Sequence, residues 1–239
     1  MKEEMQSIQS QSYAFYIEYK RPVKEFFWTL SLNHFNIKHD YLTHTDYQGK
    51  EFVLSSLDHP NRTENYQVRS ILSKGFYNWN LKASLETIYH YGKGLQAGQG
   101  IVQPYEMHWT NLKPKIDWTP THWLSASYQA EVSCNRTSSL PTLWDIQQRL
   151  SLSIGNDTWS INLRGEHYRN EIAPNQHKDT WLADVALQYN TGKWHWSANL
   201  KNLFNQKGYR YTTYSDVRSY TSWMKIRPRE MIVSVQYQW

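Results

Sequence analysis

The 239-residue chain combines a polar average composition with many aromatic residues: its mean hydropathy is -0.77, yet it contains 12 Trp and 18 Tyr. Membrane β-barrels show this combination, because their lumen and loops are polar and their aromatic residues form girdles at both interfaces. No apolar run approaches the roughly 18 residues that a spanning helix needs, which excludes a helical membrane protein. The net charge of +5 comes from scattered Lys and Arg, so no nucleic-acid partner is expected.

The N-terminal residues lack the apolar core that a secretory signal requires. We therefore expect residues 1–11 to be the tail of a fragment, and residues 12–239 to be an outer-membrane β-barrel portion of a longer protein. The single cysteine, Cys134, cannot form an internal disulfide.

Alternation of apolar and polar residues predicts the strands in the first part of the chain. Strands are expected at residues 13–20 and 28–33, with a short turn at 21–24 between them. The pattern is then lost from 38 to 64, and we interpret residues 51–57 as an extension inside a long loop. A membrane strand there would place the first two connections on the wrong sides of the sheet.

The middle of the chain predicts four further strands and a glycine-rich connection. Strands are expected at 66–72, at 77–89 after a turn at 74–76, from about 105, and at 124–133 after a turn at 118–123. Residues 92–100 are rich in glycine but do not match a phosphate-binding pattern. We expect them to form a mobile loop.

The last third predicts five strands, at 150–154, 159–163, 181–189, 194–205 and 231–239. Connections alternate between short and long along the chain, with long loops expected near 38–64, 92–102, 134–145, 170–178 and 205–226. Outer-membrane barrels show this asymmetry. The sequence therefore predicts an all-β, antiparallel transmembrane sheet of about eleven strands, an odd number that should not close a barrel unaided.

The C-terminal segment carries the most specific pattern. An expected strand ends in Asn202, Leu203, Phe204 and Asn205; a loop rich in Tyr and Ser follows, and then Arg227, Pro228 and Arg229. The final strand has an apolar face of Met231, Val233, Val235, Tyr237 and Trp239. Together these features resemble the end of a TonB-dependent outer-membrane receptor.

The resemblance implies the C-terminal half of a 22-stranded barrel in the cell outer membrane, in contact with its lipid. It implies energised uptake of a scarce ligand, a siderophore, glycan or peptide that the sequence does not identify. It also implies contact with the TonB complex through a plug domain outside this chain. The terminal strand, residues 231–239, would be recognised by the barrel-assembly machinery through its edge.

The loop before the final strand contains the candidate ligand-binding residues, which are Tyr209, Tyr211, Tyr214, Tyr220 and Trp223. Aromatic rings with a polar tip suit stacking against sugars, chelators or peptides. The same residues also suit an interfacial girdle, which we favour.

Metal, cofactor and catalytic motifs are not recognised. The ten histidines form no His-Glu-x-x-His pattern, His195 is expected to face the lumen, and the loop residues His39, Asp40, His44, Asp46 and His59 have no defined geometry. No Gly-x-Ser-x-Gly elbow is present, so we expect no enzyme and no cofactor. Two alternatives remain: an intact outer-membrane enzyme of about twelve strands, and a soluble carbohydrate-binding protein whose aromatic faces pack together.

Overall fold

The computed structural model describes residues 7–48, 51–98, 101–138, 141–215 and 218–239. Within these ranges the chain is almost entirely extended, apart from two 3-10 turns, η1 (Pro22–Lys24) and η2 (Tyr77–Trp79), and it contains no helix long and apolar enough to cross a bilayer. The strands are β1 (Ile8–Arg21), β2 (Phe26–His39), β3 (Leu42–Gln48), β4 (Glu51–Leu57), β5 (Asn61–Phe76), β6 (Leu81–Gly98), β7 (Ile101–Thr121), β8 (Leu124–Thr137), β9 (Leu143–Gly155), β10 (Trp159–Ala173), β11 (Gln176–Thr191), β12 (Trp194–Lys201), β13 (Gly208–Ser215), β14 (Arg218–Lys225) and β15 (Glu230–Tyr237).

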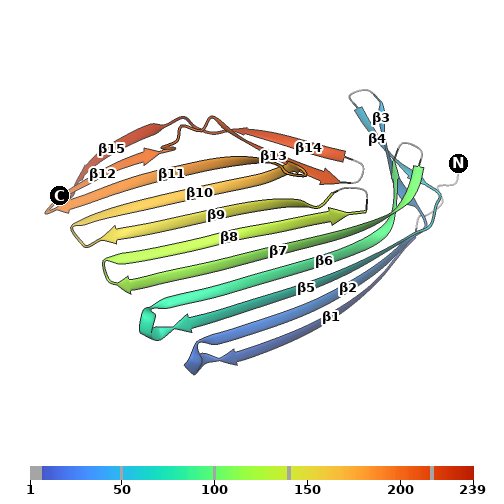
Figure 1. Ribbon diagram of the computed structural model, residues 1–239, viewed down its shortest axis with the longest axis horizontal. Helices are drawn as coiled ribbons and strands as arrows, with labels where there is room; N and C mark the ends of the chain where they lie inside the picture. The colour runs from blue at the N-terminus through green and yellow to red at the C-terminus, as the bar shows by residue number, and fades with distance from the viewer. Residues whose placement is uncertain (1–6, 49–50, 99–100, 139–140, 216–217) are drawn as a thin grey trace.

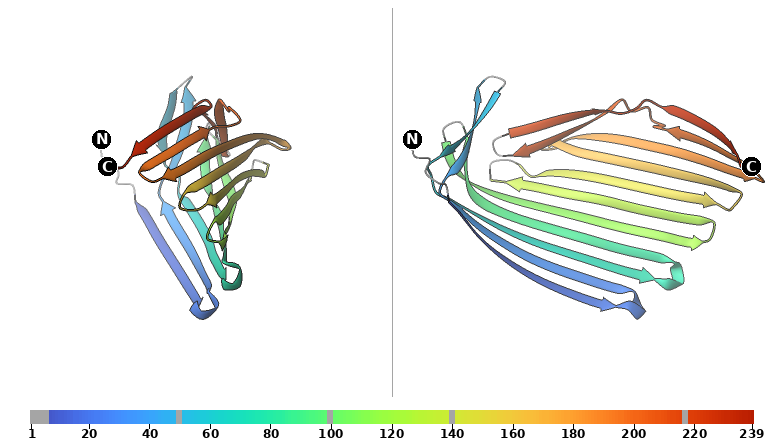
Figure 2. Two further views of the ribbon diagram at one scale, coloured as in Figure 1. Left: turned by 90° about the vertical axis from the view of Figure 1, so that its left-hand side faces the viewer. Right: turned by 180° about the vertical axis from the view of Figure 1, so that it is seen from behind.

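Eleven strands form the main path of one curved, antiparallel sheet in the order β1-β2-β5-β6-β7-β8-β9-β10-β11-β12-β15 (Figure 1). This order confirms the all-β prediction and the expected number of strands. The two side views show a single curved layer (Figure 2). Among the described residues β1 and β15 do not pair with each other, so the sheet is open along both edges.

The strands are staggered as in a barrel wall. Phe26 pairs with Lys74, although β5 continues to Phe76, and Leu81 pairs with Trp118, although β7 continues to Thr121. Offsets in this direction recur along the path at about one residue per strand. Closing a sheet into a barrel requires such a shear, because the strands must tilt against the barrel axis.

Two hairpins lie off the main path. β3 pairs with β4 and also touches β6 in parallel at His44 and Thr45. Residues 51–57 lie within the long connection, as expected, but they form strand β4, and in the described residues β4 pairs with β3 and not with the main path. The predicted long connection at 205–226 is likewise present, but it contains the separate hairpin β13–β14, which the sequence did not predict.

Two other predicted loops are strand ladders. β6 and β7 remain paired to Gly98 and Ile101, so residues 92–98 are not a mobile loop, while residues 99 and 100 lie outside the described ranges. The predicted loop at 170–178 is also wrong, because β10 and β11 pair as far as Ala173 and Gln176. Backbone hydrogen bonds therefore continue beyond the apolar band, where the sequence no longer alternates.

Three strand boundaries also differ from those predicted. The strand expected to end in residues 202–205 ends at Lys201, and those residues form the turn that follows β12. The second short turn is η2, not residues 74–76, and Asn80 ends it in the left-handed region with φ of 48°. Local bonding explains this turn, since the Asn80 N–H donates to the Tyr77 carbonyl at 3.1 Å. β1 begins at Ile8, before the expected boundary at residue 12.

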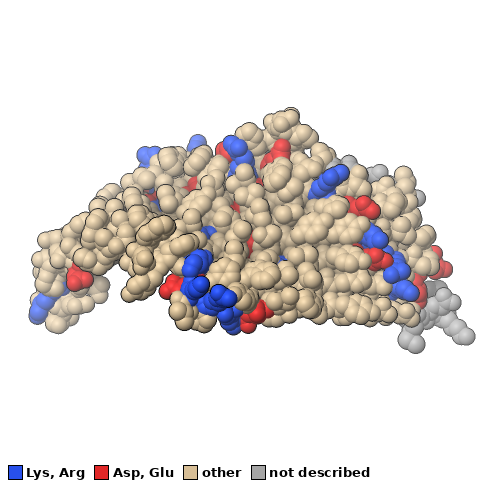
Figure 3. Space-filling view, turned by 60° about the horizontal axis from the view of Figure 1, so that its bottom comes forward, with Lys and Arg blue, Asp and Glu red and all other residues tan. Residues whose placement is uncertain are grey.

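The two faces of the sheet differ in composition. The outward face, defined here by the residues in register with Phe15 on β1 and Leu32 on β2, is apolar and exposed; Phe15 is 54% accessible. In the described residues no second sheet covers it, contrary to what a soluble sandwich would require. The lumen face, on the other side, carries polar and charged residues. Much of the surface in Figure 3 is free of charged side chains, which gather in separate groups.

Candidate functional site

A row of rings crosses five strands on the outward face. In register order it consists of Tyr13, His34, Tyr66, Tyr91 and His108. Neighbouring ring centroids are 4.3 to 6.0 Å apart. Such a row is the arrangement expected of an interfacial girdle, in which amphipathic rings lie at headgroup level.

A charged row follows immediately on the side of the long connections. The Glu64 carboxylate binds Arg62 at 3.0 Å and Lys93 at 3.1 Å, and the Arg62 guanidinium also donates to Asn36 at 3.0 Å. The Lys93 ammonium beside Glu64 holds the pKa of that carboxyl below its ordinary value. This ion cluster lies outside the apolar band and marks where the outward face becomes polar.

The apolar band below the ring row has the height of an outer-membrane hydrocarbon layer. The eight steps from Phe26 to the ring row at His34 on β2 span about 27 Å along the strand, or about 21 Å at a tilt of roughly 40°. Within this band Leu30 and Leu32 face outward. The value is close to the roughly 25 Å apolar belt of such barrels.

The lumen face is held together by ion pairs. Glu166 on β10 is the centre of the largest cluster: Arg149 and Arg164 lie 3.0 and 2.5 Å from its carboxylate, and the Tyr168 hydroxyl donates to it at 2.6 Å. Further pairs on this face join Arg69 to Glu86, Lys113 to Glu131 and Lys115 to Asp117. The charges of this wall therefore compensate one another within the sheet.

The two halves of the C-terminal motif meet in space. Asn202 is 6% accessible and has φ of 52°, and its side-chain amide donates to the carbonyls of Gln206 and Arg227 at 2.9 and 2.7 Å. Its side-chain oxygen accepts from the Gln206 N–H at 2.9 Å. The Asn202 N–H in turn donates to Asp184 on β11 at 2.8 Å. One side chain thus joins the end of β12 to the segment that enters β15.

A second set of bonds supports the same junction. Asn205 also has φ of 52°, and its side-chain oxygen accepts from the Arg229 N–H at 3.1 Å. The Arg229 guanidinium donates to the Leu203 carbonyl. We call Asn202, Asn205 and Arg229 with these bonds the motif junction. Sequence reasoning identified its residues but not the contacts between them, and it missed Asp184 and Gln206.

A hollow of about 340 Å³ lies beside the motif junction on the lumen face. Its charged lining comprises Arg164, Glu166, Asp184, Lys201, Arg227 and Glu230. Both signs of charge are equally represented, so the hollow favours no ligand of one charge.

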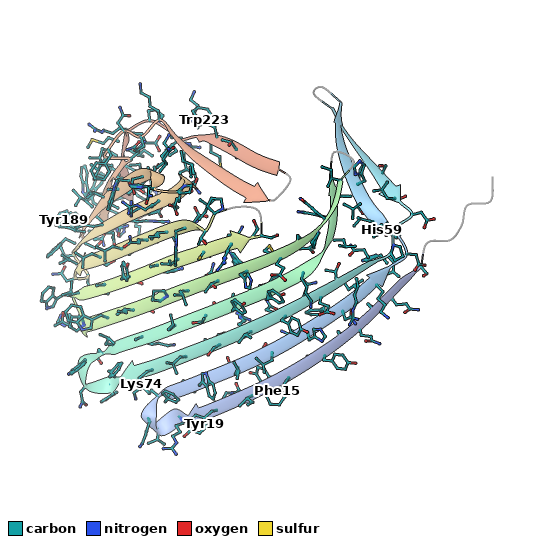
Figure 4. The ribbon with its side chains drawn as sticks, turned by 45° about the vertical axis from the view of Figure 1, so that its right-hand side comes forward. Phe15, Tyr19, His59, Lys74, Tyr189 and Trp223 are labelled. Carbon is teal, nitrogen blue, oxygen red and sulfur yellow. The ribbon has the colours of Figure 1, made fainter. Side chains whose placement is uncertain are left out.

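The predicted ligand-binding residues lie on β13 and β14. The Tyr209 ring contacts Tyr168, a lumen-face residue, at 5.2 Å between centroids, so Tyr209 does not belong to the outward girdle that we favoured. Trp223 covers Gly208, where an added Cβ would lie 2.6 Å from the indole nitrogen. The side chains of Tyr211, Tyr214 and Tyr220 lie outside the described part of the chain. Figure 4 shows Trp223 on the hairpin, far from Lys74.

The terminal strand β15 pairs with β12 along one edge from Trp194–Tyr237 to Lys201–Glu230. The predicted assembly-signal residues Met231, Val233, Val235, Tyr237 and Trp239 are 68%, 60%, 46%, 39% and 102% accessible. An exposed strand with a free edge is a template for strand addition.

The histidines do not form a recognisable metal centre. His195 is in register with Asn190 and lies 2.9 Å from its side-chain oxygen, on the lumen face as expected. In the described ranges no three His, Cys, Asp or Glu side chains converge as metal ligands. The loop residues His39, Asp40, His44 and His59 are distributed around the β3–β4 hairpin, while the side chain of Asp46 lies outside the description.

Comparison with known proteins does not assign a family. No protein-family model and no curated protein matches the chain. Among solved structures, the translocator domain of the autotransporter NalP from Neisseria meningitidis is similar at 12% identity and a TM-score of 0.25, over 98% of this chain and 88% of that one. A likeness at this TM-score carries no inference. By its own stagger, exposed apolar band, ring row and polar lumen face, the chain has the architecture of an outer-membrane β-barrel wall.

Proposed function

We propose that the chain is the C-terminal part of the barrel of a TonB-dependent receptor in the outer membrane. The motif junction carries the proposal, because its two halves are the segments that resemble the end of such receptors. Asn202 and Arg229 join them although the β13–β14 hairpin separates them in sequence. The motif therefore acts as one structural unit.

The complete receptor would take up a scarce ligand, either a siderophore, a glycan or a peptide. Energy would come from the TonB complex through a plug domain outside this chain. The polar lumen face suits contact with such a folded, polar domain, and the exposed edge of β15 suits recognition by the barrel-assembly machinery. Catalysis is not part of this function.

The test combines a mass and a binding measurement on the protein extracted from outer membranes. We expect an intact mass above the 28.6 kDa of this chain, binding to the periplasmic domain of TonB, and little ion conductance in planar bilayers, because a plug would fill the lumen. The 239-residue chain, in which no TonB-contacting segment is recognisable, is the matched control.

A protein that does not bind TonB and conducts ions continuously would contradict the proposal in favour of an open pore. Hydrolysis of lipid or ester substrates would instead favour the outer-membrane enzyme.

A further inference from the structure

The two open edges of the main sheet, β1 and β15, cross the apolar band with one side of each backbone unpaired. All 14 residues of β1 are exposed, and in the described residues its sheet partner is β2 alone. β15 likewise pairs there with β12 alone. Lipid offers no hydrogen-bond partners, so open sheet edges do not persist in the hydrocarbon layer. In a membrane, each edge therefore needs a further strand beside it.

The two edge strands run in the same direction. The eleven strands of the main path form ten ladders, and every one of these ladders is antiparallel. Strand direction is therefore reversed ten times between β1 and β15. Both strands run from the end of the sheet with the long connections to the end with the short turns (Figure 1).

This shared direction disfavours closure by the chain itself or by a second copy. Rotation about the membrane normal keeps strand direction, so pairing of β1 with β15 would be parallel in both cases. Parallel pairing is slightly less stable per residue, and no ladder of the main path uses it.

Pairing of two copies through identical edges is also unsuitable. A ladder between two β1 strands, or between two β15 strands, would be antiparallel only if one copy were upside down in the membrane. The polar cluster of Arg62, Glu64 and Lys93 would then lie on the short-turn side in that copy. Outer-membrane barrels instead place all long connections on one side. A second copy therefore fits neither edge.

We infer that the main sheet is completed by a second antiparallel sheet with an odd number of strands. Its two outer strands both run from the short-turn end to the long-connection end, because each lies antiparallel to its neighbour, β1 or β15. Neighbouring strands alternate in direction, so two outer strands of the same direction require an odd number. Added to the eleven strands of the main path, this number gives an even total, as in bacterial single-chain barrels.

The inference rests on the membrane placement in the proposed function, which makes this second sheet the rest of the receptor barrel. The edges also define which residues its outer strands present. Phe15 on β1 and Val233 on β15 face outward, whereas Glu18 and Ser234 face the lumen. The outer strands must place apolar residues in register with the first pair and polar residues in register with the second. A shift of one residue would turn polar side chains toward lipid.

Site-specific photo-crosslinking in outer membranes tests the inference. p-Benzoylphenylalanine replaces one lumen-facing residue at a time, Ser12 or Tyr16 on β1 and Ile232 or Gln236 on β15, and mass spectrometry identifies the crosslinked residues. Besides contacts with β2 and β12, we expect one new contact strand at each edge. Moving the probe from residue 12 to 16, or from 232 to 236, should shift the new contact by about four residues toward the N-terminus of that strand, because the pairing is antiparallel.

A probe at Gln67 on β5 is the matched control, because Gln67 faces the lumen with a described strand on each side. It should crosslink only to β2 and β6, near Asn33 and His90. A co-expressed copy with an affinity tag separates contacts within one chain from contacts between copies. Heat-modifiable migration on gels verifies that each variant is folded.

Crosslinks between β1 and β15, within one chain or between copies, would overturn the inference, and so would a contact that shifts toward the C-terminus. The absence of new contacts at both edges, with the Gln67 control intact, would also overturn it. Antiparallel contacts at both edges in a protein that does not bind TonB would support the second sheet and refute only the receptor assignment. Binding to TonB with β1 paired to β15 would do the reverse.

Discussion

The outward and lumen faces of the main sheet use alternate residues of the same strands but are stabilised differently. On the outward face Phe15 and Val233 are 54% and 60% accessible, so these side chains have little to pack against within the chain. On the lumen face Glu166 alone has three partners. The difference indicates that one face needs a surrounding apolar solvent, whereas the other satisfies its polar groups internally.

Introducing a charge on each face should give the largest contrast. Leu30→Lys places an ammonium in the middle of the apolar band and should lower the free energy of unfolding by about 2–4 kcal/mol. Thr29→Lys, one residue earlier, faces the lumen opposite Glu18 and should change it little. Denaturant unfolding in lipid vesicles, followed by Trp fluorescence, measures both. Equal effects would show that the faces are wrongly assigned.

Removing the Asn202 side chain should have the next largest effect. Asn202→Ala removes three side-chain hydrogen bonds and leaves an alanine at positive φ, a conformation that alanine rarely adopts. The free energy of unfolding should fall by about 2–3 kcal/mol. The effect of this substitution on the register between β12 and β15 can be measured by disulfide formation. The two cysteines are introduced by Ser197→Cys and Ser234→Cys, at positions that face each other across the two strands.

The cysteine experiment needs a Cys134→Ser background, because Cys134 is the chain's own thiol. We expect fast crosslinking with Asn202 present and slower crosslinking in Asn202→Ala. Unchanged crosslinking would mean that pairing alone fixes the terminal strand.

Neutralising the centre of the lumen cluster should have a smaller effect. Glu166→Gln keeps the shape of the side chain but removes the charge that Arg149 and Arg164 share. These pairs are partly exposed, so a loss of about 1 kcal/mol is expected, and it should shrink at high salt. Glu18→Gln, whose partner Lys20 is exposed, is the control and should have almost no effect. A salt-independent loss would contradict the electrostatic explanation.

Removing one ring from the ring row should have the smallest effect on stability. His34 stacks on Tyr66 with centroids 4.3 Å apart, and His34→Ala should lower stability by about 0.5–1 kcal/mol. His34→Phe keeps the stacking and should restore most of it. If both variants lose equally, the imidazole nitrogens rather than the stacking would be responsible.

The strands that cross the apolar band could be predicted from sequence, because their apolar and polar residues alternate. Apolar residues face outward and polar residues face the lumen. The alternating segments at 124–133 and 231–239 both fall within or across strands of the main path. Beyond the ring row this signal disappears: residues 92–98 and 170–178 do not alternate between apolar and polar side chains, yet most of their backbone remains paired.

The motif junction could be predicted only as a set of residues. Asn202 and Asn205 were identified by resemblance, but their contacts depend on left-handed backbone angles that a sequence pattern does not specify. Asn is the residue most able to adopt this conformation besides glycine. Two Asn residues at the end of a strand were therefore an available signal for a sharp, side-chain-bonded turn.

The excursion of β13–β14 between β12 and β15 also has a kinetic consequence. β9 and β10 are joined by three residues, Asn156 to Thr158, and such a hairpin can zip up from its turn. Pairing of β12 with β15 must close a much longer loop. The conformational entropy of that loop is lost before the first hydrogen-bonded residue pair between the two strands can form. We therefore expect β15 to pair with β12 last. Formation of the Asn202 hydrogen bonds would then be the final step of folding.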